Sequence, residues 1–364
     1  MGVTEDKLKS LSEQNVLDTE EASIEVIEEI LSLYVLCIND IQKELKAFIT
    51  KYGKNGIVPY SETRRRLNDN ERKIFNTELK AWYTDVRDNS MDKNYRENLQ
   101  ALGKKKYITR MEYLQAHIRN NIEKLFYKVE NILTPFFKDC YTYNYYTQKY
   151  NVLKTLAVKA EYVVLEDKDI ISAVNSKYAN TSFKNSLAGN KSKLISEMET
   201  TIPQAMARGF NISRLENIIN TKTMYSRNRN IALTRTESNY LTNKANLDFY
   251  KELKVDKYQY LATLDMRTSD MCRDMDGYIG LISQAEQGVN YPPIHVHCRS
   301  TAIPYIENIS SFGERAARNE YTGKTVSVHR SMTQEQYIKK FVPEEYRERL
   351  LKFKNSYRPK IEQN

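Results

Sequence analysis

Long apolar runs are absent from this sequence of 364 residues. No stretch approaches the roughly 18 consecutive apolar residues that a membrane-spanning helix needs, so we expect no membrane contact. The first ten residues, MGVTEDKLKS, lack the apolar core of a secretory signal. With 40% hydrophobic and 28% charged residues, the composition is that of a globular chain. We therefore expect a protein that is made and first used in a cytoplasm.

Cysteine is scarce, with four in the whole chain, which excludes a fold built on disulfides. Cys37 and Cys140 lie within apolar segments, so we expect them to be core thiols. Cys272 and Cys298 instead share a short segment with two of the four histidines. This crowding marks the segment as the candidate functional site.

The positive charge is unevenly distributed along the chain. The first 50 residues hold eleven acidic residues and four lysines, so the remaining residues carry a net charge of +16, although the whole chain carries +9. A basic body indicates a polyanionic neighbour, either DNA bound without sequence preference or an acidic protein surface. The candidate DNA contacts form three basic clusters: Arg64, Arg65 and Arg66; Lys104, Lys105 and Lys106; and Lys339 and Lys340. The alternative is that these clusters are solvated helix faces.

Strand-like alternation is also absent from the N-terminal region, where helical periodicity takes its place. Apolar residues three and four apart predict an amphipathic helix over residues 23–49. After a loop, Ser61 and Asn70 are predicted to cap two shorter helices. We therefore expect residues 1–160 to form a helical region.

A second set of helices follows the first. A long helix is predicted over residues 106–133, ending at a break before Pro135. The next helix contains a tyrosine cluster, suited to a partly wet protein interface: Tyr141, Tyr143, Tyr145, Tyr146 and Tyr150. This cluster and the helix over 23–49 are candidate surfaces for a protein partner, although both fit equally well as faces that pack on each other.

The pattern changes in the C-terminal half. Residues 161–189 are predicted to be connecting helices and loops, and polar loops are expected at 180–182 and 189–192. A long helix is expected from about residue 224 to 253, followed by three short strands beginning near Tyr258, Gly277 and Ser300. Residues 306–364 form a basic polar tail, with one helix predicted over 333–353.

Cys272, His295 and Cys298 have the residue types and spacing of a zinc site. Two residues separate His295 from Cys298, which lets both side chains turn toward one ion, and Cys272 supplies a third ligand from the preceding loop. His297 is a further candidate ligand. The alternative is a metal-free hairpin in which the thiols and imidazoles pack and hydrogen-bond.

An ordered set of motifs resembles the Mu F-like domain of phage head morphogenesis proteins, over roughly residues 190–305. The set runs IALTRTE at 231–237, DMRT at 265–268, Cys272, DG at 276–277 and PPIHVHCR at 292–299. The motif residues outside the zinc set are Arg235, Glu237, Asp265, Arg267, Thr268, Asp276, Gly277, Pro292, Pro293 and Arg299. Two positions that are often cysteine in this family are Ser269 and Ser300 here. Because a hydroxyl is a poor zinc ligand, a fourth ligand has to come from Asp270, Asp276, His297 or water.

Four of the charged motif residues suit a structural role. Arg235 and Glu237 in the helix, with Asp265 and Arg267 at a strand end, are predicted to form a charge-assisted network that fixes the hairpin to the helix. The catalytic alternative makes Glu237 a general base beside a metal. No helical pair of histidines four residues apart supports that alternative.

The resemblance implies a mainly α fold with a small C-terminal α+β module. It further implies a minor structural protein of a tailed-phage head, without catalytic activity and with zinc as its one candidate cofactor. The expected partners are the portal, scaffold and major capsid proteins, and the expected place is inside the head near the portal, after assembly in the host cytoplasm. Two alternatives remain open: a metal-dependent nuclease or toxin-like effector that uses His295, His297 and Cys298, and a non-specific DNA-binding protein.

Overall fold

The computed structural model describes residues 5–89, 91–156, 164–305, 314–319, 321–322 and 324–329, with five single positions beyond them. Its described residues are mainly helical, with a small antiparallel sheet near the C-terminus, so the predicted fold class is confirmed. Two compact units divide the chain. The sheet-bearing unit comprises Met1–Glu25, Thr134–Phe183 and Ala232–Asn364, and the helical unit comprises Val26–Leu133 and Lys184–Ile231.

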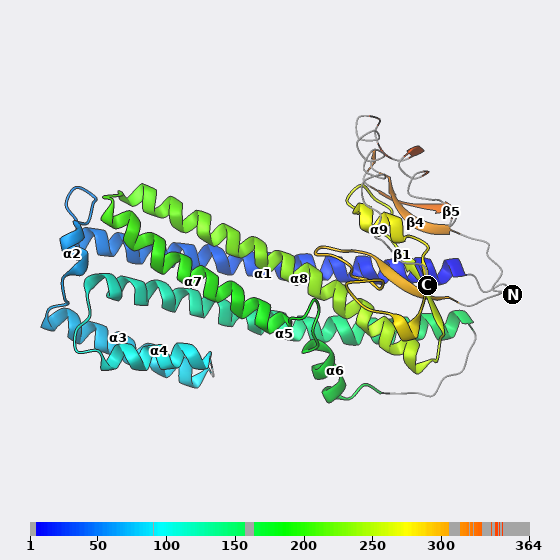
Figure 1. Cartoon of the computed structure of the whole chain (residues 1–364), viewed down its shortest axis with the longest axis horizontal. Helices are drawn as coiled ribbons and strands as arrows, with labels where there is room; N and C mark the ends of the chain where they lie inside the picture. The colour runs from blue at the N-terminus through cyan, green and yellow to red at the C-terminus, as the bar shows by residue number, and fades with distance from the viewer. Residues whose placement is uncertain are drawn as a thin grey trace. The chain divides into compact units, whose positions relative to one another are not determined.

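The helical unit contains long segments of four helices: α1 (Glu5–Tyr52), α5 (Arg110–Leu156), α7 (Phe183–Ala207) and α8 (Ile212–Glu252). These segments lie side by side (Figure 1), and buried polar contacts join them: the Tyr34 hydroxyl of α1 lies 2.9 Å from Ser226 of α8. Three shorter helices complete the unit: α2 (Tyr60–Arg64), α3 (Asp69–Asp88) and α4 (Lys93–Lys104). A core around Phe75, Leu79 and Tyr95 holds α3 and α4 against α5.

Both short helices are capped two residues before the predicted cap. Asn68, rather than Asn70, caps α3, because Asn68 and Glu71 stand three apart and form a reciprocal capping box. Pro59, rather than Ser61, precedes α2. The fixed φ of proline suits the entrance to a helix without a side-chain cap.

The predicted break at Pro135 is wrong, because α5 continues through it. A proline inside a helix removes one backbone hydrogen bond and costs about 3 kcal/mol. Leu133 and Phe137 on either side are completely buried, and Phe137 packs edge-on against Phe183 at 5.0 Å. Burial of these flanking side chains offsets the local cost.

Three helices are longer than predicted. Helix α1 begins at Glu5, and α8 begins at Ile212, well before the expected residue 224. Helix α7 runs through the loop expected at 189–192, and residue 190, the predicted domain boundary, lies inside it. In each case packing against neighbouring helices overrides weak local propensity.

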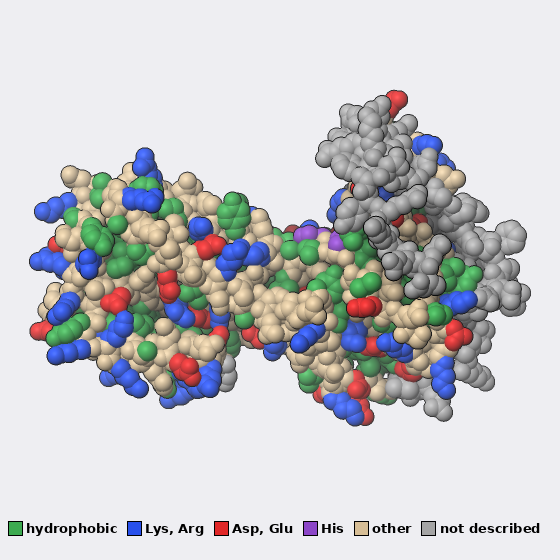
Figure 2. All heavy atoms as spheres, in the orientation of Figure 1, with side chains coloured by type: hydrophobic (Ala, Val, Ile, Leu, Met, Phe, Trp, Pro, Cys, Tyr) green, Lys and Arg blue, Asp and Glu red, His purple; other side chains and the backbone are tan. Residues whose placement is uncertain are grey.

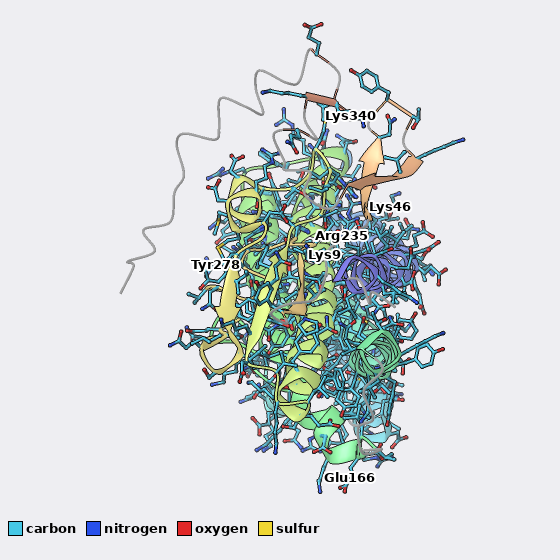
Figure 3. All side chains as sticks on the ribbon, turned by 90° about the vertical axis from the view of Figure 1, so that its right-hand side faces the viewer. Lys9, Lys46, Glu166, Arg235, Tyr278 and Lys340 are labelled. Atoms are coloured by element: carbon cyan, nitrogen blue, oxygen red, sulfur yellow. The ribbon has the colours of Figure 1, made fainter. Side chains whose placement is uncertain are left out.

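The sheet-bearing unit contains the three predicted strands, β1 (Lys257–Leu261), β2 (Ile279–Leu281) and β3 (Thr301–Tyr305). They pair antiparallel in the order β2-β1-β3, with Tyr258 opposite Gly280 and Pro304. The C-terminal part of α8 lies beside this sheet (Figure 3), where the Tyr250 hydroxyl donates to the Ala302 carbonyl at 3.0 Å.

Short elements connect these strands and complete the unit. Helix α9 (Asp270–Met275) and a 3-10 turn, η1 (Ile282–Gln284), flank β2, and α6 (Asp167–Val174) precedes α7. Gly277 has a φ of +83°, and the Asp276–Gly277 dipeptide reverses the chain between α9 and β2.

The segment expected to be a polar tail contains a hairpin that sequence analysis did not foresee. Strands β4 (Glu314–Asn319) and β5 (Lys324–His329) pair antiparallel, with Ala316 opposite Ser327. Most of the helix predicted over 333–353 lies outside the described residues. Within the described part of the chain, no helix has the length and apolar character to cross a membrane.

Candidate metal centre

The structure brings Cys272, His295 and Cys298 together. The Cys272 Sγ lies 3.0 Å from the His295 Nε2 and 3.6 Å from the Cys298 Sγ. Cys272 and Cys298 are 2% and 1% exposed, and His295 is half-buried at the edge of the group. Among the described residues this is the one group of three or more potential metal ligands within such distances.

Local backbone structure positions each of the three candidate ligands. Ser269 caps α9 by accepting a hydrogen bond from the Cys272 backbone N–H at 3.3 Å, which places Cys272 in the first turn. The loop that follows Pro292 and Pro293, joined by a cis peptide bond, carries the other two ligands. Its turn is closed by the Cys298 N–H, which donates to the His295 carbonyl at 3.2 Å.

Helix α8 supports this loop from outside. The Asn239 side-chain amide donates to the carbonyls of Cys298 and Ser300, at 2.7 and 3.3 Å. One helical turn later, the Asn243 amide donates to the same Ser300 carbonyl at 3.1 Å. Sequence analysis missed both asparagines, although their spacing of four places them on one face of α8.

The donor set fits zinc. With Zn–S bonds of about 2.3 Å, two thiolates on a tetrahedral ion lie about 3.8 Å apart, close to the observed 3.6 Å separation. The His295 Nδ1 lies 2.7 Å from the Val296 carbonyl. A proton on Nδ1 that donates there leaves the Nε2 lone pair facing the thiols, as a metal ligand requires.

Two hydroxyls occupy the fourth side of the group. The Ser269 Oγ lies 2.7 Å from the His295 Nε2, and the fully buried Tyr260 hydroxyl lies 3.3 Å from the Cys272 Sγ. The acidic candidates for a fourth ligand are held elsewhere, since Asp270 pairs with Arg273 at 2.7 Å and Asp276 accepts from the Ala262 N–H at 2.9 Å. A zinc ion held here would therefore take water or a hydroxyl as its fourth ligand. Tyr260 had been assigned only to a strand.

The two thiols differ in their readiness to ionise. Hydrogen bonding from Cys298 outweighs burial and lowers the pKa of Cys272 to about 6, whereas burial raises the pKa of Cys298 well above its usual value. A thiolate is the form that binds metal. Cys272 is thus ready to bind at neutral pH, and Cys298 has to release its proton on binding.

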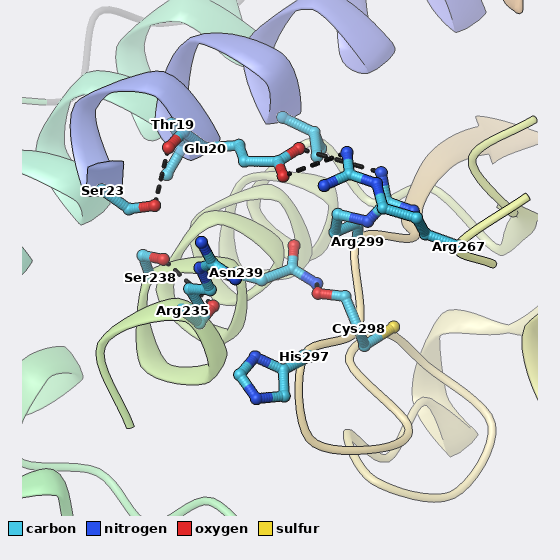
Figure 4. A pocket seen from close by; sticks show the side chains of 11 residues that line it. Thr19, Glu20, Ser23, Arg235, Ser238, Asn239, Arg267, His297, Cys298 and Arg299 are labelled. Atoms are coloured by element: carbon cyan, nitrogen blue, oxygen red, sulfur yellow. Dashed lines mark hydrogen bonds and ion pairs between the residues drawn. The ribbon is translucent and has the colours of Figure 1, made fainter. Parts of the chain in front are cut away.

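His297 does not join the group, contrary to the prediction. Its φ of +63° places it in the left-handed region, and its backbone N–H donates to the Thr236 Oγ1 at 3.1 Å. The turn sends its imidazole to a cavity lined by Arg235 (Figure 4).

The predicted charge network has different members. Arg299 donates to both oxygens of Asp265, at 2.5 and 2.6 Å, and the Thr268 hydroxyl donates to the same carboxylate at 3.0 Å. Arg267 lies 3.6 Å from Asp265 and 3.4 Å from Glu20 of α1. Burial opposes ionisation of Asp265, but the Arg299 guanidinium holds the pKa of that carboxyl below its usual value.

Arg235 and Glu237 lie outside this network, which corrects the prediction. Arg235 is exposed at the cavity, whereas Glu237 is 4% exposed with no ion pair among the described residues. Burial raises the pKa of Glu237 to about 8. Residues two apart lie on nearly opposite faces of a helix, so sequence proximity did not make Arg235 and Glu237 partners.

Residues 196–303 match the family model described as Phage Mu protein F like protein. This segment of the chain is similar to the Mu F-like family. The matched segment runs from within α7 into β3 and includes all three ligand candidates, so the resemblance drawn from the ordered motifs is confirmed there. The family indicates a phage head morphogenesis protein. Neither the curated proteins nor the solved structures contain a match to the chain.

Two of the three basic clusters adjoin each other in the helical unit. The Leu67 N–H donates to the Ile108 carbonyl at 2.8 Å, which joins the segments that carry the clusters. Arg66 stacks over the Tyr107 ring at 3.8 Å, and Lys106 lies 5.2 Å from the same ring. Lys339 and Lys340 belong to the sheet-bearing unit and are exposed. The face drawn in Figure 2 shows basic and acidic side chains interspersed.

Proposed function

We propose that this protein is a minor structural component of a tailed-phage head, associated with the portal vertex and acting in procapsid assembly, DNA packaging or delivery. The observation that carries the proposal is the Mu F-like match over residues 196–303. In this proposal the protein resides inside the virion head near the portal, and in the host cytoplasm during assembly. Scaffold and major capsid proteins are its further partners.

We further propose that zinc at Cys272, His295 and Cys298 is structural. The two thiols are almost fully buried, and the fourth side of the group faces the Ser269 and Tyr260 hydroxyls, whereas catalytic zinc keeps its fourth position open to substrate. The ion would join α9 to the loop before β3, and the Asn239 amide holds that loop on α8. Zinc would thereby fix the hairpin as a rigid surface.

A non-enzymatic role is supported over the nuclease and effector alternatives. The two cysteine ligands are almost fully buried, which leaves little access for a phosphodiester. The alternative nuclease also needs His297 beside the metal, but His297 points into a separate cavity. Glu237, the candidate general base, is buried, and its carboxylate does not belong to the group of ligand atoms that lie within 4.8 Å of one another.

Exposed apolar and tyrosine side chains support a protein partner in each unit. Tyr143 and Tyr150 are 48% and 61% exposed, whereas Tyr141 and Tyr145 are buried and donate to acidic residues of α8. In the helical unit, adjacent residues Val35 and Leu36 of α1 are each 56% exposed. We assign these as contact surfaces for portal or scaffold.

Co-expression with the portal protein of the same phage tests the assignment. A complex that copurifies through size-exclusion chromatography, and the chain's presence in isolated procapsids by mass spectrometry, are the expected results. Val35→Glu combined with Leu36→Glu should weaken the complex, while the matched exposed change Ile74→Glu on α3 should not. Absence of the wild-type chain from both portal complexes and procapsids would count decisively against the assignment.

A further inference from the structure

A cavity of about 150 Å³ lies within the sheet-bearing unit, beside the loop that carries the metal ligands. Its walls come from α1, α8, Arg267 and residues 297–299 (Figure 4). Three arginines line it, Arg235, Arg267 and Arg299. Glu20 is the carboxylate among the lining residues, so positive charge is in excess.

The ion pairs around the cavity leave one guanidinium unpaired. Arg299 is held by Asp265, and Arg267 lies within 4 Å of both Asp265 and Glu20. Two carboxylates therefore neutralise two arginines. Arg235 has no ion pair within the part of the chain that the structure describes, and its side chain is exposed to the cavity. A surplus of about one positive charge faces the cavity.

His297 adds a second group without a partner. Its left-handed backbone conformation, with a φ of +63°, costs energy for a residue with a side chain. That conformation places the imidazole on the same side of the cavity as Arg235 (Figure 4). Within the described residues, its ring nitrogens form no hydrogen bond. Strain that aims an unpartnered donor at a basic cavity is typical of a binding site.

We propose that this cavity binds one phosphodiester group of a nucleic acid. A phosphodiester carries one negative charge, which matches the surplus charge of the lining. Planar guanidinium groups donate paired hydrogen bonds to phosphate oxygens, and the imidazole supplies a further donor. A cavity of about 150 Å³ has room for the phosphate but not for paired bases, so binding here carries no sequence preference. The inference rests on the proposed function, in which the chain lies beside packaged DNA, and it assigns residues outside the three basic clusters.

Fluorescence anisotropy with a short labelled DNA duplex tests the proposal on the full-length, zinc-loaded chain. Loss of one phosphate contact should weaken binding about eightfold near 0.1 M salt and should reduce the salt slope by about 0.9. Arg235→Gln is expected to show both effects, and Arg235→Lys, which keeps the charge, should retain the slope. Glu20→Gln removes a competing carboxylate and should strengthen binding, an opposite change that a damaged fold would not produce.

Arg214→Gln is the matched control, because Arg214 is exposed on the same helix but belongs to the helical unit. Equal losses of duplex affinity in Arg235→Gln and Arg214→Gln, or no loss of affinity in either variant, would overturn the inference. A rise in melting temperature with inorganic phosphate, together with unchanged duplex affinity in Arg235→Gln, would overturn it in favour of a free-phosphate site. An Arg235→Gln chain that enters procapsids and binds duplex like the wild type refutes this inference alone, and leaves the proposed function standing.

Discussion

The imidazole of His295 lies 3.0 Å from the thiol of Cys272, although 23 residues separate them in sequence. The intervening chain leaves the cap of α9, reverses at Gly277, pairs β2 with β1 and returns through the diproline. The α9 cap, the pairing of β2 with β1 and the return through the diproline thus bring together three ligands. Neither half of the hairpin contains all three by itself.

Metal content is the most direct consequence of this geometry. Purified chain, prepared without chelator, should contain about one zinc by elemental analysis, because three ligands converge at zinc-like separations. Cys298→Ala should abolish the metal. Cys140→Ala removes another buried thiol, from α5, and should leave the zinc content unchanged. Clearly substoichiometric zinc in the wild type would favour the metal-free hairpin.

Ser269→Cys should tighten zinc binding by at least about tenfold, because a thiolate is a much stronger ligand than a hydroxyl. The Ser269 Oγ already lies 2.7 Å from the His295 Nε2, so the new sulfur would enter at the fourth side. Competition against a zinc chelator measures the change. Ser269→Ala loses the contact with the His295 Nε2 and the α9 cap, which is worth about 1 kcal/mol, and should not tighten binding. Equal affinities for the cysteine and alanine variants would refute a fourth position at residue 269.

Glu237 should destabilise the fold increasingly as the pH rises. Burial raises the pKa of Glu237 to about 8, so the folded state holds a proton that an unfolded glutamate releases near pH 4.3. The loss of folding free energy is absent below about pH 4.3 and grows until the pH reaches about 8. Glu237→Gln should therefore raise the free energy of unfolding by on the order of 3 kcal/mol near pH 7 and by almost nothing near pH 4.

Calorimetry of the Glu237→Gln variant at several pH values measures this difference. The matched control is Glu29→Gln, an exposed change on α1 that should show no such trend. A gain in stability that does not vary with pH would indicate a packing effect instead.

His117, within the helical unit, should likewise make the fold less stable as the pH rises, in this case through the loss of a stabilising charge. Its two ring nitrogens each lie 3.2 Å from a carboxylate, Glu44 on one side and Glu78 on the other. Burial acts against the charged ring, but the two carboxylates prevail and raise the pKa of His117 to about 9. The resulting stabilisation is complete below the unfolded pKa of about 6.5 and is lost as the pH rises through 9.

An NMR titration of the imidazole should give a midpoint near 9 for His117. His117→Gln should lower the free energy of unfolding by about 3 kcal/mol below pH 6.5 and by little above pH 9. Glu78→Gln should move the midpoint down. A midpoint near 6.5 in the wild type would show that the carboxylates do not hold the proton.

The adjoining basic clusters should bind duplex DNA without sequence preference. Replacing Arg65 and Lys105 with glutamine removes two exposed charges, although each pairs with a nearby glutamate. We expect weaker binding to all duplexes and a shallower salt dependence between about 50 and 200 mM. A mobility-shift titration measures both. Strong preference for one sequence would favour a dedicated DNA-binding protein, and cleavage that disappears with His295→Ala would favour the nuclease alternative.

Much of the local structure could be predicted from residue patterns. Apolar spacing of three and four indicated the α1 and α8 helices, and the alternation around Tyr258 indicated β1, because both periodicities follow from backbone geometry. The ordered motifs from Ile231 to Arg299 were sufficient to indicate the Mu F-like domain. Helix ends were predicted less well, since the packing of distant segments decides them. For example, α5 continues through Pro135, where the neighbouring Phe137 is buried.

By itself, then, the sequence determined the helical character, the strand positions and the grouping of Cys272, His295 and Cys298, since short spacings and periodicities are local properties. Only the tertiary structure decided which neighbours became partners. It turned His297 away from the metal ligands through one left-handed residue, and it paired Asp265 with Arg299 instead of Arg235. It also placed the Tyr260 hydroxyl against the thiols. Such choices depend on how separate elements pack, and no spacing within a single segment specifies them.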